Sequence, residues 1–254
     1  MVRRALLGAP PAEIRRLEAT GDRSWPPRRT LTGPGWELRF GDGLHSRRNS
    51  ATVWADAADA PDVHRRRITA AYRAAGLPPT VKLTRASLDG LDGHLAGAGW
   101  TRAAETLVLT RGVRATAPGT VAVAPGPSGD WLDAFTALAG YDGRRRTALR
   151  ALLGDIRHPL GQVVVRVGGD VAAVGMAVAD GAHAGIFDVV THPDHRGRGL
   201  AGRVVAALLG WSGRRGARTA YLQVTDDNAP ARRLYARLGF AGRYRYWYRT
   251  APGP

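Results

Sequence analysis

Apolar and polar residues alternate along the chain with helical and strand-like spacing, which predicts a succession of helices and strands. In the second half, the apolar run Ala184–Val190 has the composition of a strand and ends in a turn that contains Pro193. A stretch rich in alanine and valine follows at 199–213 with helical spacing, and the next strand-like run is Thr219–Val224. A strand, loop, helix and strand in this order predict a mixed α/β layered sheet.

The same reasoning gives an element order for each half of the chain. In the first half we expect helices at 11–20, 61–75 and 87–97, and strands at 35–40, 48–54, 80–84 and 103–110. In the second half we expect helices at 128–138, 143–153, 199–213 and 229–238, and strands at 119–124, 161–168, 171–179, 183–190, 218–224 and 242–249. Because residues 112–129 are rich in Gly, Pro, Ala and Thr, we predict two domains, 1–111 and 119–254, joined by a linker at 112–118.

When the second half of the sequence is shifted back by 140 residues, it aligns with the first half. The shift brings Gly216 onto Gly76, Gly239-Phe240 onto Gly99-Trp100, and Thr219–Val224 onto Pro79–Thr84. The strand 244–249 falls on 104–109. This alignment predicts an internal repeat. The loop Arg196-Gly-Arg-Gly199 falls on Asp56-Ala-Ala-Asp59, so the first copy replaces cations and glycines with carboxylates.

The loop Arg196-Gly-Arg-Gly199 is suited to binding a phosphate group. Glycines at the start of a helix let backbone N–H groups point at one anion, and the helix dipole adds favourable potential. The guanidinium groups of Arg196 and Arg198 can form charge-assisted hydrogen bonds with phosphate oxygens. The sequence therefore predicts a pyrophosphate-binding loop.

Two common phosphate-binding loops fit this segment poorly. A Walker loop requires a lysine after its last glycine, and the only lysine in the chain is Lys82. The spacing Gly197-x-Gly199-x-x-Gly202 matches the dinucleotide fingerprint. That fingerprint follows the first strand of a βαβ unit, whereas this loop lies late in the chain after a Thr-His-Pro turn.

Arg196-x-x-Gly199-x-Ala201 resembles the acyl-CoA pyrophosphate loop of the GCN5-related N-acetyltransferases (GNAT family), whose pattern is Gln/Arg-x-x-Gly-x-Gly/Ala. A second block resembles the family's signature Asn-x-x-Ala-x-x-Leu-Tyr-x-x-x-Gly-Phe and matches it at Asn228, Ala231, Leu234, Tyr235, Gly239 and Phe240. The resemblance covers residues 118–249 and implies the GNAT fold. It also extends to tandem members of the family, in which a degenerate N-terminal copy packs against a working C-terminal copy.

The resemblance implies an acetyl-CoA-dependent N-acetyltransferase in which a primary amine attacks the thioester directly, without an acyl-enzyme. The pyrophosphate would be bound by the loop residues Arg196, Gly197, Arg198, Gly199, Leu200 and Ala201. Val189, Val190 and Thr191 would bind the pantetheine arm, with a backbone N–H near Val190 stabilising the oxyanion. Asn228 would contact the cofactor or cap the next helix. Tyr235 matches the general acid that protonates the leaving thiolate, although it would also suit a core position.

The general base cannot be the residue type that many relatives use. Many relatives use a Glu on the strand before the loop, but the last Glu of this chain is Glu105. Asp188 is the nearest acid, and simple strand alternation would place it on the same face as Val190. An ion-paired surface carboxylate and a water chain are the alternatives. We expect His192 and His195 to be loop residues.

The motifs do not identify the acceptor. We expect the helices within 128–153 to build the acceptor cleft, where four residues would face a cationic amine or serve as caps and surface: Asp130, Asp133, Tyr141 and Asp142. We favour a small-molecule amine because a covering N-terminal domain would narrow the cleft. The alternatives are another acyl-CoA or an aminoacyl donor, a protein acceptor, and a non-catalytic module that binds acetyl-CoA or nucleic acid.

Composition restricts these readings further. The net charge of +16 would suit nucleic acid, but the arginines are spread along the whole chain, as in proteins from GC-rich genomes, and would also help to recruit anionic acetyl-CoA. The chain has no cysteine, which excludes disulfides, thiolate metal sites and cysteine nucleophiles. Its seven histidines are scattered, so we expect no metal site. No apolar run approaches the roughly 18 residues of a membrane span, so we expect no membrane partner and a cytoplasmic protein.

Two further clusters have no assigned chemistry. Trp36 and the run Arg47-Arg48-Asn49-Ser50 lie near predicted strands, where packing and surface charge are favoured over a substrate role. The terminal strand is aromatic, with Tyr244, Tyr246, Trp247 and Tyr248. It could be an edge that pairs with another subunit, which would make a homodimer.

Overall fold

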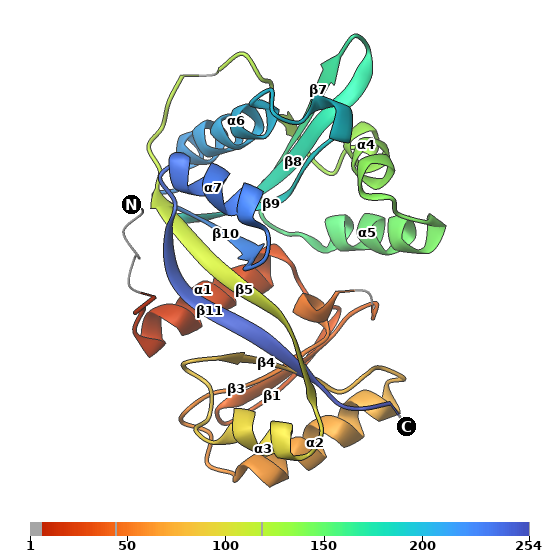
Figure 1. Cartoon of the computed structure of the whole chain (residues 1–254), viewed down its shortest axis with the longest axis vertical. Coiled ribbons are helices and arrows are strands. Elements are labelled where there is room, and N and C mark those ends of the chain that lie inside the picture. Colours follow the sequence, from red (N-terminus) through yellow and green to blue (C-terminus); the bar gives the residue numbers. More distant parts are fainter. Residues whose placement is uncertain (1–6, 44, 118, 254) are drawn as a thin grey trace. The chain divides into compact units, whose positions relative to one another are not determined.

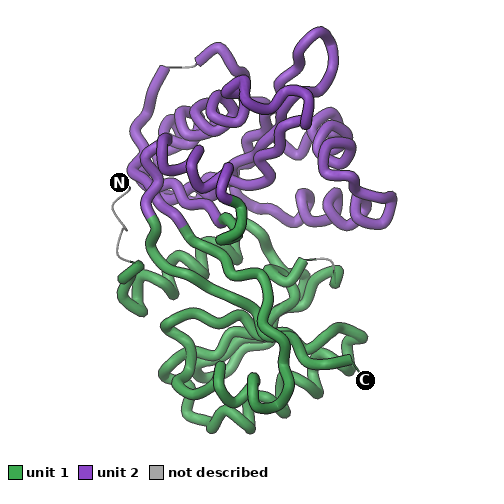
Figure 2. Tube along the Cα trace, in the orientation of Figure 1, with its two compact units in different colours: residues 1–108, 224–228, 242–254 green, residues 109–223, 229–241 purple. Residues whose placement is uncertain are grey.

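The computed structural model describes residues 7–43, 45–117 and 119–253 and has the predicted mixed α/β character (Figure 1). Pro118 of the predicted linker lies outside the described residues. The chain forms two compact units (Figure 2): unit 1 is 1–108, 224–228 and 242–254, and unit 2 is 109–223 and 229–241. The predicted domain boundaries at 111 and 119 divide the chain into two copies of a sequence repeat. This division differs from the two compact units, so the boundaries stay a prediction. None of the described helices is long and apolar enough to cross a membrane.

In its described residues, unit 1 is a sheet with three α-helices and one short 3₁₀ helix. Its strand order is β1 (Arg29–Gly33), β2 (Trp36–Phe40), β3 (Ala51–Val53), β4 (Thr80–Thr84), β11 (Ala241–Thr250) and β5 (Thr101–Gly112). Its helices are α1 (Pro11–Ser24), α2 (Pro61–Ala74), α3 (Leu91–Gly97) and the short 3₁₀ helix η1 (Ser46–Arg48). Strands β3 and β4 are parallel, and β4 and β11 are antiparallel.

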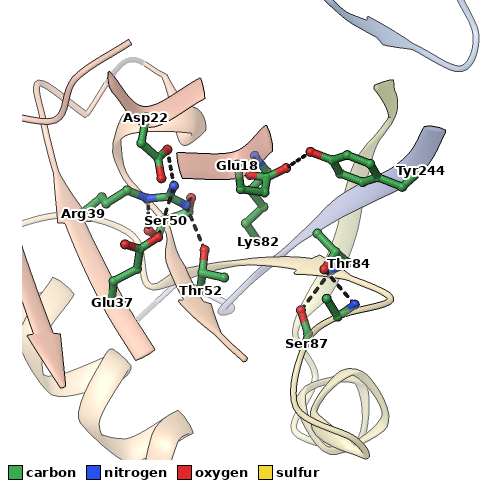
Figure 3. A network of polar contacts seen from close by, with 11 residues as sticks. Glu18, Asp22, Glu37, Arg39, Ser50, Thr52, Lys82, Thr84, Ser87 and Tyr244 are labelled. Atoms are coloured by element: carbon green, nitrogen blue, oxygen red, sulfur yellow. Dashed lines mark hydrogen bonds and ion pairs between the residues drawn. The ribbon is translucent and has the colours of Figure 1, made fainter. Parts of the chain in front are cut away.

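The two faces of the unit 1 sheet have different chemistry because side chains alternate along each strand. One face packs against α2 and α3 in an apolar core that includes Leu38, Val53, Val81, Leu83, Ile68, Tyr72, Leu91 and Leu95. The other face carries charged and hydroxyl side chains (Figure 3). There Glu18 and Asp22, one turn apart on α1, form ion pairs with Lys82 and Arg39. Arg39 also donates to Ser50 O, at 3.2 Å, and to Thr52 Oγ1, at 3.0 Å.

The aromatic terminal strand β11 is not an edge. It pairs with β4 in register from Tyr246↔Thr84 to Thr250↔Thr80 and has β5 as its other neighbour. The premise for a homodimer through this strand is therefore wrong. The run Arg47-Arg48-Asn49-Ser50 makes contacts within the fold. Arg48 is buried and ion-paired with Asp42 at 2.9 Å, and Asn49 Oδ1 accepts from Gly41 N at 2.7 Å.

Unit 2 contains an antiparallel meander followed by a parallel crossover. Its further strands are β6 (Ala124–Pro125), β7 (Leu160–Val167), β8 (Asp170–Asp180), β9 (His183–Thr191) and β10 (Thr219–Thr225). Its helices are α4 (Gly129–Ala139), α5 (Gly143–Asp155), α6 (Leu200–Arg214), α7 (Ala229–Arg237) and the 3₁₀ helix η2 (Pro193–His195). Strands β7, β8 and β9 are antiparallel neighbours, and β10 returns parallel to β9 after α6.

Helices α4 and α6 both contact β7, β8 and β9, and they lie on opposite sides of these strands (Figure 1). Two glycines allow α6 to approach closely: a Cβ at Gly175 would lie 2.6 Å from Val204, and one at Gly161 would lie 2.6 Å from Trp211. On the α4 side, Trp131 Nε1 donates to Gly175 O at 2.9 Å. Strand β8, which carries Gly175, is therefore packed against α6 on one face and α4 on the other.

Helices related by the 140-residue shift end in the same way. Gly76 and Gly216 both have positive φ, and the following residues donate back across the last turn, Leu77 N to Tyr72 O and Ala217 N to Ser212 O. Gly99 and Gly239 also have positive φ, and the residue after each of them donates its N–H to the carbonyl five residues earlier, as Leu77 and Ala217 do. Glycine is favoured there because it adopts the left-handed conformation without a Cβ penalty. The repeat seen in the sequence is thus accompanied by a repeat of local structure.

Most predicted elements occur within two residues of their expected ends, but four differ by more, and one strand was not predicted. The predicted helix 11–20 extends to Ser24, and the predicted strand 48–54 is limited to Ala51–Val53. The predicted strand 119–124 is wrong, since only Ala124–Pro125 pairs with β7; Pro125 and Pro127 have no N–H with which the ladder could continue. The predicted helix 87–97 begins at Leu91, because Ser87 bridges to Trp54 and Gly90 takes a left-handed conformation. Strand β1 was not predicted.

Candidate functional site

The parallel strands β9 and β10 pair at their beginnings and then separate. Their ladder has three rungs, from Thr219↔His183 to Tyr221↔Gly185, although β9 continues to Thr191. At the last rung a Cβ on Gly185 would lie 2.4 Å from the Phe187 ring and 2.7 Å from Tyr221 Oη. The two rings meet edge to face with centroids 5.9 Å apart. The end of β9 therefore lacks its β10 partner, which leaves backbone groups for a ligand at the carboxyl ends of parallel strands.

A β-bulge lies in the same part of β9. Val190 pairs with Val174, but Phe187 pairs with Met176, so β9 has one residue more than β8 across this interval. Asp188 takes a left-handed conformation with φ +52°. Phe187 and Val190 consequently share a face, and the simple alternation expected to group Asp188 with Val190 is wrong, because a bulge interrupts the period of two. The Asp188 side chain is half-buried.

The loop after β9 has the features that the sequence predicted for anion binding. Gly197 and Gly199 have φ of +77° and +74°, and open space lies where their Cβ atoms would be. Gly199 is the N-cap of α6 and has no side chain to cap the first turn. The N–H groups of Leu200, Ala201 and Gly202 therefore need an acceptor from outside the helix.

Two arginines stand beside this exposed helix start. Arg196 Nε donates to Thr191 O at 3.4 Å, and Arg198 Nη1 lies 3.4 Å from His195 Nδ1. Both side chains are exposed. Thr191 Oγ1 is buried and has no hydrogen-bond partner among the described residues. A polyanion with a polar arm fits these groups, because it would supply acceptors to the loop and a partner for Thr191.

Tyr235 lies on α7 with its ring against Phe240, at a centroid separation of 5.8 Å. Burial raises the pKa of its hydroxyl to about 12. Within the described residues no hydrogen bond engages that hydroxyl. The group is thus protonated at neutral pH and available to donate, which suits a general acid.

The other predicted residues discussed are Asn228, His192 and His195, and their contacts point less directly to a reaction. Asn228 directly precedes α7, and its N–H donates to Thr225 O at 3.1 Å. His192 is the N-cap of η2 and His195 is its last residue, and their ring centroids are 5.8 Å apart. They border an open cavity of about 360 Å³ together with Asp170, Asp194, Ala137 and Leu138.

The acids expected in the acceptor cleft have structural partners. Asp142 caps α5 by accepting from Arg145 N at 2.8 Å. Asp130 and Asp133 are exposed and form ion pairs with Arg166 and Arg146. Sequence reasoning did not find Gly185, Phe187 and Tyr221. A glycine within an apolar strand was the available signal, since it often marks a close approach.

Comparisons with known proteins agree with this geometry. The family described as "Probable histone acetyltransferase Rv0428c C-terminal" matches residues 11–249. The chain belongs to the GCN5-related N-acetyltransferases. This N-acetyltransferase is 28% identical over 247 residues to the N-acetyltransferase YobR of Bacillus subtilis (strain 168), covering 93% of this chain and 98% of YobR.

Solved structures show the same fold. A GCN5-related N-acetyltransferase from Kribbella flavida superposes with a TM-score of 0.66 at 21% identity, covering 94% of this chain and 95% of that one. A tandem GNAT protein from the clavulanic acid biosynthesis pathway gives a TM-score of 0.61 at 17% identity, covering 94% and 88%. The predicted GNAT fold is confirmed, and members of this family use acetyl-CoA.

Proposed function

We propose that this acetyltransferase moves an acetyl group from acetyl-CoA to the primary amine of a small molecule. The observation that carries the proposal is the uncapped start of α6, which follows the end of β9 that no longer pairs with β10. The loop from Arg196 to Ala201 would bind the pyrophosphate through backbone N–H groups and two guanidinium groups. Val189, Val190 and Thr191 would bind the pantetheine arm along the strand edge.

When bound, acetyl-CoA supplies an activated thioester that an amine can attack. The N–H near Val190 would donate to the oxyanion that forms at the carbonyl. Asp188 would accept a proton from the ammonium of the acceptor, and Tyr235 would donate a proton to the departing thiolate. Direct attack needs no protein nucleophile, which agrees with a sequence without cysteine.

The first half of the chain is proposed to be a degenerate copy that does not bind acetyl-CoA. The carboxylates that replace the loop cations and glycines, Asp56 and Asp59, form ion pairs with Arg15 and Arg67. The helix that follows begins with Pro61 rather than after an open glycine turn. An added pyrophosphate would meet like charge there, so we expect one acetyl-CoA per chain.

Calorimetric titration with acetyl-CoA tests the proposal on wild type, Gly199→Asp and Gly216→Asp. Both glycines have positive φ, with open space where a Cβ would be, and they lie just before and just after α6. The two variants should therefore lose similar stability, but only Gly199→Asp places a carboxylate in the loop. We expect one micromolar site in wild type and Gly216→Asp, and at least about tenfold weaker binding in Gly199→Asp. No binding by wild type, or equal loss in both variants, would refute the site.

Thiol release from acetyl-CoA then identifies the acceptor in a panel of small amines and amine-bearing peptides. A protein without cysteine contributes no background to this assay. Turnover with small amines and none with peptides is the expected result. The reverse would leave acetyl transfer intact and overturn the small-molecule assignment.

A further inference from the structure

A second open cavity of about 720 Å³ lies in unit 2, away from the candidate acetyl-CoA loop. It is bordered by the end of β5, the segment 113–116, the second half of α6, Arg218 before β10 and Leu238 after α7. The nearest α6 residue on it is Ala206, six positions beyond Leu200. A cavity of this size is within the range that encloses small organic ligands.

The cavity and the loop lie at opposite ends of β9. Arg218 N donates to Ala182 O at 2.8 Å, which fixes this border of the cavity just before the first residue of β9. The loop follows the last residue, and β9 has nine residues. At about 3.3 Å per residue the strand separates the loop from Arg218 by roughly 25 Å. Along α6, the nearest cavity residue, Ala206, lies about 9 Å beyond Leu200 at the loop. A ligand of the cavity therefore does not need to contact the pyrophosphate loop.

Among the residues that the structure describes, three arginines and no acids border the cavity. Arg111 is held in place, because Nε donates to Gly112 O at 3.1 Å and Nη1 donates to Leu238 O at 2.5 Å. Arg114 and Arg218 are exposed, and no ion pair or hydrogen bond engages their side chains within the described residues. The cavity thus presents one fixed and two available guanidinium groups.

The rest of the described lining is apolar apart from the backbone of its glycines and the hydroxyl of Thr116. Val113 and Leu209 are buried, and Ala206 and Leu238 complete an apolar floor. The segment that carries Arg114 packs tightly on α6: a Cβ at Gly213 would lie 2.5 Å from Arg114 O, and one at Gly210 would lie 2.7 Å from Thr116 Oγ1. Arg214 Nη1 also donates to Thr116 O at 2.8 Å. Because the backbone beside the arginines is fixed, little ordering is needed when a ligand binds.

We propose that this cavity binds a small amphipathic organic anion, an apolar ring or chain that carries a phosphate or carboxylate group. The apolar floor would take the body of the ligand, and Arg114 and Arg218 would bind its anionic group, since guanidinium pairs well with both acids. The site is separate from the acetyl-CoA site and does not depend on the proposed transfer reaction.

The test is fluorescence and calorimetric titration of the full chain with 1-naphthyl phosphate, 1-naphthoate and uncharged 1-naphthol, each with and without saturating coenzyme A. The variant is Arg114→Ser/Arg218→Ser. Its control is Arg144→Ser/Arg150→Ser, which removes the same charge from exposed arginines of α5 that are not on the cavity. Acetyl-CoA affinity is measured separately on every protein.

We expect saturable binding of one naphthyl phosphate, weaker binding of naphthoate and weakest binding of naphthol, unchanged by coenzyme A. Binding of the phosphate should weaken at least about tenfold in Arg114→Ser/Arg218→Ser and stay within about twofold in the control. Acetyl-CoA affinity should not change. Equal binding by the two variants would overturn the proposal. Displacement by coenzyme A would also overturn it, by making the cavity part of the acetyl-CoA site. Tighter binding of naphthoate would identify a carboxylate ligand.

Discussion

Gly185 and Tyr221 form the last rung of the β9–β10 ladder, and the Phe187 ring occupies the space beside this glycine. A residue with a Cβ would collide there with Phe187 at 2.4 Å and with Tyr221 Oη at 2.7 Å. The rings of Phe187 and Tyr221 are buried and meet edge to face. Gly185 thus allows two large side chains to meet where the strands separate, and this contact fixes the start of the candidate ligand site.

Gly185→Ala should disturb the packing at the point where β9 separates from β10. The added methyl has no free space, so we expect a loss of stability of about 1–3 kcal/mol and at least about tenfold weaker acetyl-CoA binding. Thermal unfolding and calorimetry measure the two effects. Gly154→Ala in α5 is the control, because nothing lies within 4 Å of its Cβ position. If both variants bound acetyl-CoA as wild type does, the contact at Gly185 would have no part in the site.

Tyr235→Phe tests the general acid. Removing the hydroxyl should lower kcat about 10²-fold and leave acetyl-CoA affinity within about twofold, because the proton is needed only when the thiolate leaves. Steady-state kinetics and calorimetry separate these quantities. An unchanged kcat would show that Tyr235 is a core residue and not the general acid.

The raised pKa of Tyr235 also makes a prediction about stability. Burial raises its pKa from 10 to about 12, so the folded chain holds this proton more tightly than the unfolded chain does. The resulting stabilisation is complete below pH 10 and is lost as pH rises through about 12. The free energy of unfolding of wild type should therefore fall relative to Tyr235→Phe between these values, as measured by urea unfolding at pH 9 and pH 11. A constant difference would contradict the burial effect.

Asp188→Asn tests the base without disturbing the bulge, because asparagine tolerates the left-handed conformation at least as well as aspartate. We expect kcat/KM at neutral pH to fall about 10²-fold. The deficit should shrink as pH rises, because more acceptor amine is then unprotonated. Asp170→Asn, an exposed change at the start of β8, should have no effect. An unchanged rate and pH profile in Asp188→Asn would favour a water chain.

Local sequence signals predicted the helices and the loop of the site well. Gly199 precedes α6, Gly216 and Gly239 follow α6 and α7, and all three have positive φ, so glycine marks these helix boundaries within the local sequence. The bulge at Asp188 depends on how β9 pairs with β8. The three-rung ladder depends on packing around Gly185, and the place of β11 depends on a pairing with β4 across more than 150 residues. These features depend on how strands pair and pack and not on the residues of one strand, so the sequence alone left them undetermined.

Lys82, the only lysine, is buried with Glu18 beneath α1, and Tyr244 Oη donates to the same carboxylate at 2.6 Å (Figure 3). Burial tends to raise the pKa of Glu18, but the Lys82 ammonium and these hydrogen bonds hold it below its ordinary value. The stabilisation from this carboxylate is therefore present above pH 4.5 and is lost as pH falls further. Lys82→Met leaves a buried carboxylate without its cation, and we expect unfolding at about 3–5 kcal/mol lower free energy at pH 7.

Glu18→Gln/Lys82→Met should recover part of this loss, because no buried carboxylate is then left without its cation. In Lys82→Met alone, burial dominates and raises the pKa of Glu18, so the deficit against wild type should shrink as pH falls and the carboxylate gains a proton. Arg166→Met is the control, since its ion pair with Asp130 is exposed and should contribute little. Urea unfolding of the four proteins at pH 7 and pH 5 gives the comparison. An equally small loss in Lys82→Met and Arg166→Met would show that α1 is held to the unit 1 sheet by its apolar contacts rather than by this ion pair.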